Sequence, residues 1–288
     1  MLIKEGKISL QFFLISNLLV LLPILDFISP FLFIINTRQN IIWFQFIFLF
    51  ILIVLLKLFS RGIYFKVGIR SIFLGGVFST GIFVILYSTN GWQLFGYYMC
   101  IMSFFHYSEF LTIAYCNPKT LSISSFLINH SVPYNIAAIA SWIEFFTEIY
   151  FLPGLKRYNF LACIGFILCI VGEGLRKTAM ITGSTNFAHI VQTEKDDKHV
   201  LVTHGIYSLF RHPSYVGWFY WSIGTQVLLL NPICTIAYTI ASWRFFNERI
   251  YHEEHSLLYF FGQEYMKYQK SVKTGLPGIK GFLLHEQN

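Results

Sequence analysis

The chain has 288 residues, of which 55% are hydrophobic and only 12% are charged, and its formal net charge is +7. A soluble domain ordinarily carries about 45–50% apolar and about 25% charged residues, so this chain has too few charges to cover a globule in water. Its aromatic share of 19% suits a surface that faces lipid. Soluble secreted and disordered classes are therefore excluded, and the composition indicates an integral membrane protein.

Long apolar runs predict an all-α membrane protein with about eight transmembrane helices, at about 20 residues per span. We expect the first run to be retained, because it is too long for a signal peptide and lacks a small-residue cleavage site. Pro23, Asp26 and Pro30 predict a kink or a break in it. The predicted helices are Leu10–Ile35, Ile41–Leu58, Ile69–Tyr87, Trp92–Tyr115, Tyr134–Leu152, Tyr158–Ile181, Pro213–Leu230 and Pro232–Phe246.

The last two predicted helices are joined only by Asn231 and Pro232, which is too little chain for a domain between them. We therefore expect a tight antiparallel hairpin. After Phe246 the helical pattern should continue as an interfacial helix through Phe261. Strand-type alternation is essentially absent from the sequence.

Basic residues in short loops set the expected orientation. Lys57, Arg61, Lys66 and Arg70 follow the second predicted helix and place that loop in the cytosol. Alternation along the chain then puts both termini in the cytosol, together with the long polar stretch 183–212. The loop at 156–157 disagrees, because its Lys and Arg would be luminal, so the fifth span is a candidate for incomplete crossing.

Polar side chains divide the chain into two functional parts: a transmembrane scaffold over residues 1–152 and a second part over 153–288 that carries the chemistry. This boundary is functional and does not imply independent folding. The polar groups gather between Glu173 and Glu254, and they include Gln192, His199, His204, Tyr207, Arg211, His212, Tyr215, Arg244, Glu248, Arg249, Glu253 and Glu254.

The stretch from His204 to Trp218 runs directly into the seventh predicted helix. Pro213 suits the first turn of a helix, which leaves the N–H groups of Ser214 and Tyr215 at a positive helix end that could bind a carboxylate or a ribose hydroxyl. Alternatively, Arg211 and His212 form only a snorkelling basic cap at a membrane boundary.

A second stretch, from Trp243 to His255, leaves the eighth predicted helix. Arg249 and Glu253 are four residues apart and share a helix face. They are either an ordinary ion pair, worth a few tenths of a kcal/mol, or functional groups, since charges at a membrane boundary are costly and are functional candidates by default.

Metal and nucleotide motifs fit the sequence poorly. His252 and His255 are three residues apart, whereas a zincin needs a separation of four, so no metal site is expected. Gly172 and Gly174 lack the third glycine of a dinucleotide fingerprint. The cysteines lie in or beside apolar runs without paired spacing, so we interpret them as small buried hydrophobes: Cys100, Cys116, Cys163, Cys169 and Cys234.

At these two stretches the chain resembles the isoprenylcysteine carboxyl methyltransferases of the endoplasmic reticulum membrane. The resemblance is carried by Gln192–Val202, by Gly205 through Tyr220-Trp221 with its Arg-His-Pro-Ser-Tyr-Val-Gly-Trp string, by Asn231-Pro-Ile-Cys, by Arg244-Phe-Phe through Glu253-Glu254, by Phe261-Gly-Gln-Glu-Tyr and by Thr274-Gly-Leu-Pro. Tyr251 and His252 depart from it, since family members often have more acids there.

The resemblance implies an S-adenosylmethionine-dependent enzyme that methyl-esterifies the carboxylate of a C-terminal farnesyl- or geranylgeranyl-cysteine, on proteins such as small GTPases, without a metal or nucleic acid. It makes residues 153–288 the methyltransferase core, with Arg249 binding and orienting the substrate carboxylate. The implied cofactor-binding residues are Gln192, His199, Val200, Leu201, Val202, Tyr207, His212, Pro213, Ser214, Tyr215 and Glu253.

The chemistry agrees with this reading, because an α-carboxylate with a pKa of about 3.3–3.7 is already ionised near neutral pH and needs no general base. The shorter Arg-His-Pro string also occurs in membrane phospholipid methyltransferases and sterol reductases, so a phospholipid N-methyltransferase and an NADPH-dependent reductase remain alternatives. A transporter would more naturally distribute its polar residues at the bilayer midplane and in internal repeats.

Overall fold

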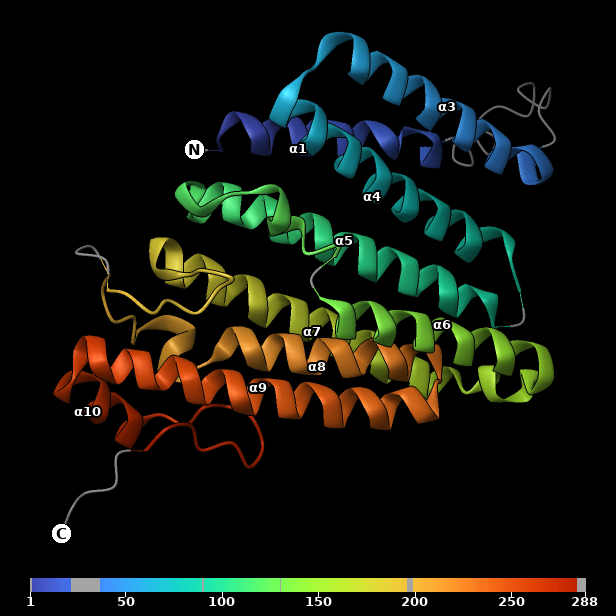
Figure 1. The fold of residues 1–288 in the computed structure, drawn as a ribbon. Coiled ribbons are helices and arrows are strands. Elements are labelled where there is room, and N and C mark those ends of the chain that lie inside the picture. Colours follow the sequence, from blue (N-terminus) through green and yellow to red (C-terminus); the bar gives the residue numbers. More distant parts are fainter. Residues whose placement is uncertain (1, 22–36, 90, 130, 196–198, 284–288) are drawn as a thin grey trace. The chain divides into compact units, whose positions relative to one another are not determined.

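The structure is a computed structural model that describes residues 2–21, 37–89, 91–129, 131–195 and 199–283. In this part of the chain every regular element is a helix, as predicted (Figure 1). The α-helices are α1 (Lys4–Ser16), α3 (Thr37–Phe59), α4 (Gly62–Tyr87), α5 (Trp92–Cys116), α6 (Val132–Phe151), α7 (Asn159–Gly183), α8 (Pro213–Leu229), α9 (Pro232–Phe261) and α10 (Gln263–Ser271). The 3₁₀ helices are η1 (Leu18–Leu21), η3 (Pro118–Thr120), η4 (Ile123–Phe126), η5 (Pro153–Arg157), η6 (Ser184–Asn186) and η7 (Gly205–Ser208).

Most predicted helix bounds agree with these elements, and α9 continues through Phe261 as expected. The first predicted helix, Leu10–Ile35, is wrong at its start and in its length, because α1 begins at Lys4 and ends at Ser16, before the separate η1. The beginning of α4 was predicted wrongly, because the helix starts at Gly62 and not at Ile69. Lys66 and Arg70 were taken as loop charges, yet Lys and Arg are good helix formers, and Arg70 Nη1 donates to Lys66 O along the helix at 3.0 Å. The predicted break at Pro23, Asp26 and Pro30 lies outside the described residues.

Three helical segments of the described chain are long and apolar enough to cross a membrane: Ile41–Phe59, Gly62–Tyr87 and Asn159–Asn186. The first of them exposes large apolar side chains, including Trp43, Phe50 and Phe59. Apolar side chains on the outside of a spanning helix are expected where lipid is the solvent. The chain is therefore an all-α protein with membrane-spanning helices.

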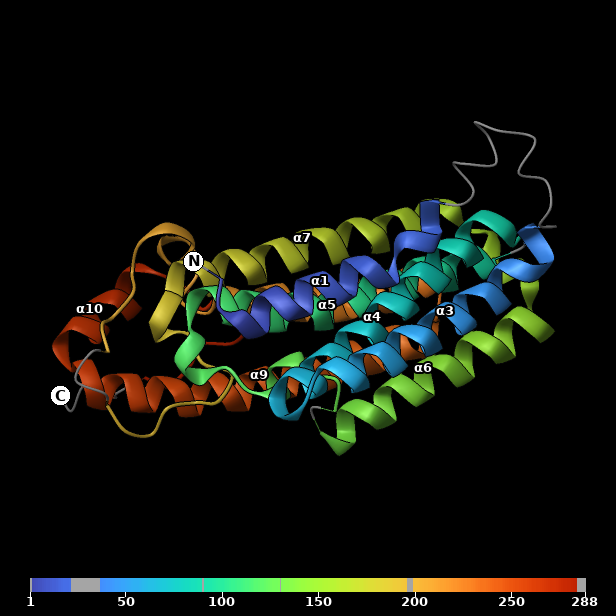
Figure 2. The same ribbon diagram turned by 90° about the horizontal axis from the view of Figure 1, so that it is seen from above.

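The chain forms two compact units, Met1–Ala162 and Cys163–Asn288. In the first unit α4 packs against both α1 and α5; it lies between them in Figure 1, and the three helices overlap in Figure 2. Small residues allow this close approach, as in many membrane helix pairs. A Cβ at Gly81 would lie 2.8 Å from the carbonyl oxygen of Gly96, and Ser9 on α1 shares a 2.8 Å hydrogen bond with Ser71 on α4.

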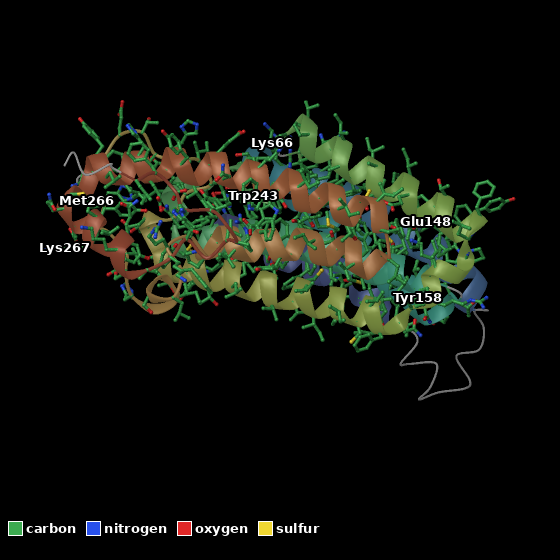
Figure 3. All side chains as sticks on the ribbon, turned by 90° about the horizontal axis from the view of Figure 1, so that it is seen from below. Lys66, Glu148, Tyr158, Trp243, Met266 and Lys267 are labelled. Carbon is green, nitrogen blue, oxygen red and sulfur yellow. The ribbon has the colours of Figure 1, made fainter. Side chains whose placement is uncertain are left out.

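A buried ion pair closes the end of the first unit. Lys156 Nζ in η5 lies 2.6 Å from Glu148 Oε2 on α6, and the Lys156 side chain has no exposed surface (Glu148 is labelled in Figure 3). The ammonium group also lies 4.8 Å from the ring centre of Phe145. Lys156, which disagreed with the predicted orientation, is thus neutralised by a neighbouring helix and is not a free loop charge.

In the second unit α7 and α8 pack backbone to backbone. A Cβ at Gly172 would lie 2.6 Å from the carbonyl oxygen of Gly217, and a Cβ at Gly217 would lie 2.5 Å from that of Gly172. Gly172, which fits no nucleotide fingerprint, therefore serves helix packing. This contact places the C-terminal end of α7, which is predicted to face the cytosol, against the first turn of α8.

The expected hairpin of α8 and α9 is present, and the two helices lie side by side in Figure 1. Leu230 adopts a left-handed conformation at the turn, with φ of 56°, and Asn231 N donates to Gln226 O at 3.0 Å. The C-terminal segment, residues 272–283, then returns along the hairpin. Its Leu276 and Ile279 pack into a core with Val216, Phe246 and Ile250, and Trp243 Nε1 donates to Pro277 O at 2.8 Å.

Candidate active site

A pocket opens in the second unit between the end of α7, the loop that follows it, the first turn of α8, the second half of α9 and α10. Tyrosine, phenylalanine and histidine rings form much of its wall, and carboxylate and hydroxyl groups are placed among them. Every residue predicted to bind the cofactor lines this pocket: Gln192, His199, Val200, Leu201, Val202, Tyr207, His212, Pro213, Ser214, Tyr215 and Glu253.

The loop before α8 is held in place by hydrogen bonds to three helical elements. Val200 N donates to Asn186 Oδ1 at 2.9 Å, which anchors the extended run of residues 199–202 beside η6. The Tyr207 hydroxyl donates to Ala179 O on α7 at 3.2 Å, and the Tyr268 hydroxyl on α10 donates to Tyr207 O at 2.5 Å. Tyr207 is therefore fixed from both sides as part of the pocket wall.

The first turn of α8 differs in one respect from its expected form. Pro213 occupies the first helical position, as predicted. The N–H of Tyr215, however, donates to His212 O at 3.0 Å, and Val216 N donates to the same oxygen at 3.1 Å. The prediction that the Tyr215 N–H is free to bind a ligand is therefore wrong, because the His212 carbonyl closes the turn.

Tyr215 connects the two candidate groups on α9. Its hydroxyl accepts a hydrogen bond from Arg249 Nε at 2.9 Å and donates one to Glu253 Oε2. Arg249 also donates through Nη2 to His189 O in the loop after α7. Arg249 reaches the pocket through Tyr215, so the arrangement is a three-residue network and not an isolated ion pair along α9.

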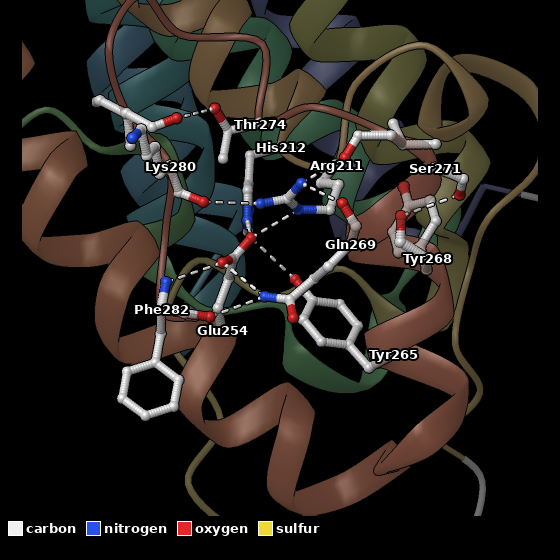
Figure 4. Close-up of polar contacts among 12 residues, drawn as sticks. Arg211, His212, Glu254, Tyr265, Tyr268, Gln269, Ser271, Thr274, Lys280 and Phe282 are labelled. Carbon is white, nitrogen blue, oxygen red and sulfur yellow. Dashed lines mark hydrogen bonds and ion pairs between the residues drawn. The ribbon is translucent and has the colours of Figure 1, made fainter. Parts of the chain in front are cut away.

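A buried carboxylate, that of Glu254, lies behind the residues that line the pocket (Figure 4). Glu254 Oε1 accepts hydrogen bonds from Arg211 Nε at 2.8 Å, His212 Nε2 at 3.0 Å and the Tyr265 hydroxyl at 3.1 Å. All three donor residues line the pocket. Arg211 is only 6% exposed, so its side chain is not a snorkelling cap at the membrane boundary, and the sequence alternative that made it one is wrong.

The charge state of Glu254 follows from these contacts. Burial taken alone would raise the pKa of its carboxyl, but the hydrogen bonds from His212 and Arg211, together with the positive charge of Arg211, outweigh burial and lower the pKa below its ordinary value. Burial, together with the charge of the same carboxylate, raises the pKa of the Tyr265 hydroxyl, which stays protonated as a donor. Glu254 is therefore an ionised acceptor at neutral pH.

Sequence reasoning assigned no role to Arg176. This arginine on α7 is 2% exposed, its Nη1 donates to Ser214 Oγ at 2.8 Å, and its guanidinium lies 4.7 Å from the ring centre of Trp218. The signal was present, since a charged residue within an apolar helix is a functional candidate by default. Through these contacts with Ser214 and Trp218, Arg176 holds the first turn of α8 against α7.

Other polar residues of the two stretches stay outside the pocket. His204, Arg244, Glu248, His252 and His255 are exposed. Across the described residues, no group of three or more histidine, cysteine, aspartate or glutamate side chains is arranged to hold a metal ion. Only some of the polar residues between Glu173 and Glu254 therefore lie at the pocket.

Comparisons with known proteins identify the family to which this chain is similar. The family model of the isoprenylcysteine carboxyl methyltransferase family matches residues 163–259. A protein-S-isoprenylcysteine O-methyltransferase from Tribolium castaneum is 51% identical over 284 residues, covering 98% of this chain and 99% of the relative. The Homo sapiens protein of the same name is 48% identical over 280 residues, covering 96% and 94%.

A solved structure has the same fold as this chain. It is described as the eukaryotic intramembrane Ras methyltransferase isoprenylcysteine carboxyl methyltransferase, and it is 51% identical in sequence. The match covers 97% of this chain and 99% of that one, with a TM-score of 0.90. At this level of identity, the relative from Tribolium castaneum and the solved structure each match almost the whole of this chain. The chain belongs to the isoprenylcysteine carboxyl methyltransferase family.

Proposed function

We propose that this chain transfers the methyl group of S-adenosylmethionine to the carboxylate of a prenylated C-terminal cysteine. The relatives bear the name of this reaction. The observation that carries the proposal is that Tyr215 joins Arg249 to Glu253 by hydrogen bonds; Tyr215 and Glu253 line the pocket, and Arg249 lies just outside its lining. This network couples a cation suited to a substrate carboxylate with an anion suited to a cationic cofactor.

The pocket has the side chains that a nucleoside sulfonium requires. Glu253 can accept hydrogen bonds from ribose hydroxyls or from an ammonium group. The rings of Tyr207 and Tyr215 offer faces to a positive charge. His199 lies against Phe260 and Phe261, with ring centres 5.8 and 5.7 Å apart, and these rings can enclose a flat base. When bound, S-adenosylmethionine would supply an electrophilic methyl group.

Arg249 would hold the substrate carboxylate. Its guanidinium already donates hydrogen bonds to Tyr215 and to the His189 carbonyl. These two contacts restrict the rotation of the guanidinium and so fix the directions of its remaining N–H groups. A planar guanidinium binds a carboxylate with two parallel hydrogen bonds. Since the carboxylate is ionised near neutral pH, the residues need only orient it and exclude water.

The membrane arrangement follows from the substrate. A prenyl chain partitions into lipid, and its terminal carboxylate stays at the interface. We propose about eight spans with both termini in the cytosol, within the endoplasmic reticulum membrane, with residues 1–152 as scaffold and 153–288 as the methyltransferase core. The Glu148–Lys156 pair neutralises one of the two charges that disagree with this orientation, while Arg157 stays exposed. The protein substrates would be prenylated proteins such as small GTPases.

Labelled S-adenosylmethionine with a farnesylcysteine analogue tests the reaction directly. The purified chain in lipid should form a methyl ester that is released by mild base. A geranylgeranyl analogue should also react, and a farnesylcysteine amide, which lacks the carboxylate, should not. A folded preparation that binds S-adenosylmethionine and labels none of these substrates would refute the proposed reaction.

A further inference from the structure

The two oxygens of Glu254 contact different parts of the second unit. Oε1 accepts from Arg211, His212 and Tyr265, which line the pocket. Oε2 accepts from Gln269 Nε2 at 3.0 Å and from Phe282 N at 3.0 Å. One fully buried carboxylate therefore joins the pocket wall to α10 and the C-terminal segment, residues 272–283.

Arg211 also joins the pocket wall to α10 and the C-terminal segment. Its backbone N–H donates to Lys273 O at 2.8 Å, and its guanidinium donates to Val272 O, to Gln269 O at 3.3 Å and to Lys280 O at 3.0 Å (Figure 4). The C-terminal segment contributes no side chain to the pocket, but its carbonyl groups hold the arginine that faces Glu254. Its effect on the pocket therefore passes through Arg211 and Glu254, and also through the Thr274 carbonyl, which accepts from His212 N at 3.2 Å.

His212 is the residue on which this network acts. An ionised carboxylate only accepts hydrogen bonds, so the proton on the shared contact belongs to His212 Nε2. In the neutral ring Nδ1 is then the acceptor. The ring is also stacked on Tyr215, with centres 5.6 Å apart and planes 5° from parallel. Glu254 therefore sets the tautomer of His212, and Glu254 and Tyr215 together set the orientation of its ring.

We propose that Glu254 is a positioning residue of the cofactor pocket: it fixes the orientation and tautomer of His212 and couples them to the C-terminal segment. This inference rests on the proposed binding of S-adenosylmethionine. Glu254 itself does not line the pocket. It acts through His212, and its loss should therefore change cofactor affinity more than the maximal rate.

A double-mutant cycle separates positioning from simple support of the fold. E254Q should weaken S-adenosylmethionine binding, measured by calorimetry, by about tenfold, because hydrogen bonds to charged groups are the strong ones. In the H212A background the same change should alter the dissociation constant less than about twofold. An equal loss in both backgrounds would overturn the proposal.

T274V is the matched control for general loosening of the C-terminal segment. It removes the buried 2.6 Å hydrogen bond from Thr274 Oγ1 to Ile279 O and leaves every contact of Glu254 in place. We expect T274V to lower the melting temperature without changing cofactor affinity. If T274V weakens binding as much as E254Q does, the affinity loss reflects loosening, and Glu254 has no positioning role.

A measurement on the unsubstituted chain covers the case in which E254Q does not fold. Nitrogen-15 NMR of histidine-labelled protein, with the His212 signal assigned by its loss in H212A, should find a proton on Nε2. A proton on Nδ1 alone would overturn the proposal. If the unsubstituted chain fails to bind S-adenosylmethionine, the proposed cofactor is refuted, while this tautomer measurement still decides the Glu254 contact.

Discussion

The Tyr215 hydroxyl accepts a 2.9 Å hydrogen bond from Arg249 Nε, although the two residues lie on different helices and 34 positions apart. The same hydroxyl donates to Glu253, one turn further along α9. Two groups that the sequence places four residues apart are thus linked through the first turn of α8. Their roles can be separated, because each has a different ligand chemistry.

R249K tests whether Arg249 needs its planar group. Lysine keeps the charge but cannot contact Tyr215, His189 O and a carboxylate in one plane. We expect the methyl-transfer rate to fall about 10- to 100-fold, on the basis of one lost charge-assisted hydrogen bond, with S-adenosylmethionine binding retained. R244K is the matched control on the exposed face of α9 and should be fully active. An R249K enzyme with normal kinetics for the prenylcysteine substrate would show that only charge matters there.

E253Q tests the anion of the network. The amide keeps the shape of the side chain and removes its charge, so the apparent Michaelis constant for S-adenosylmethionine should rise about tenfold. Saturating cofactor should restore most of the rate. E248Q, an exposed carboxylate on the same helix, is the control and should behave like the unsubstituted chain. A loss of rate that saturating cofactor does not restore would contradict the assignment.

Acid should destabilise the second unit through Glu254. Its pKa is lower in the folded chain than the ordinary value of 4.5, so the folded state holds fewer protons than the unfolded state as the pH falls. The stabilisation is complete above that ordinary value and is lost progressively as the pH falls through the folded pKa. Melting temperatures between about pH 7 and about pH 3.5 measure this loss. E254Q should show a smaller acid-induced decrease, and parallel decreases would rule out Glu254 as the cause.

K156A should destabilise the first unit. It leaves the Glu148 carboxylate buried without the ammonium group that lies 2.6 Å away. Removing one partner of a buried ion pair typically costs about 3–5 kcal/mol. The exposed neighbour Arg157 provides the control, and R157A should leave the melting temperature unchanged. Similar melting temperatures for both variants would mean that the pair contributes little to stability.

The proposed orientation places both ends of the chain in the cytosol. Epitope tags at either end should become accessible to antibody after selective permeabilisation of the plasma membrane, because the basic cluster from Lys57 to Arg70 favours the cytosolic side. A luminal epitope in the same cells reports intact internal membranes. Tags that are detected only after those membranes are opened would reverse the topology.

Most of the secondary structure could be predicted from local pattern alone. These signals involve only residues that are close together in the sequence: apolar runs of spanning length, Pro213 and Pro232 at helix starts, and the two-residue link between α8 and α9. The corresponding elements occur where predicted. The exceptions were local misreadings, such as the first turns of α4, whose lysine and arginine were taken for a loop. The residues of the pocket were named from a family resemblance and not from this periodicity.

The pairings inside the site depended on tertiary structure. Arg211 and Glu254 are 43 residues apart, and Arg176 and Ser214 are 38 apart. No spacing rule relates positions on different helices, because their contact depends on which helix faces meet and how closely. The glycines of α7 and α8 set that distance. From the sequence alone, Arg211 is interpreted as a surface cap and Glu254 as one acid among several. In the folded chain both are buried, and they pair because a charge removed from water is costly unless it has a partner of opposite charge.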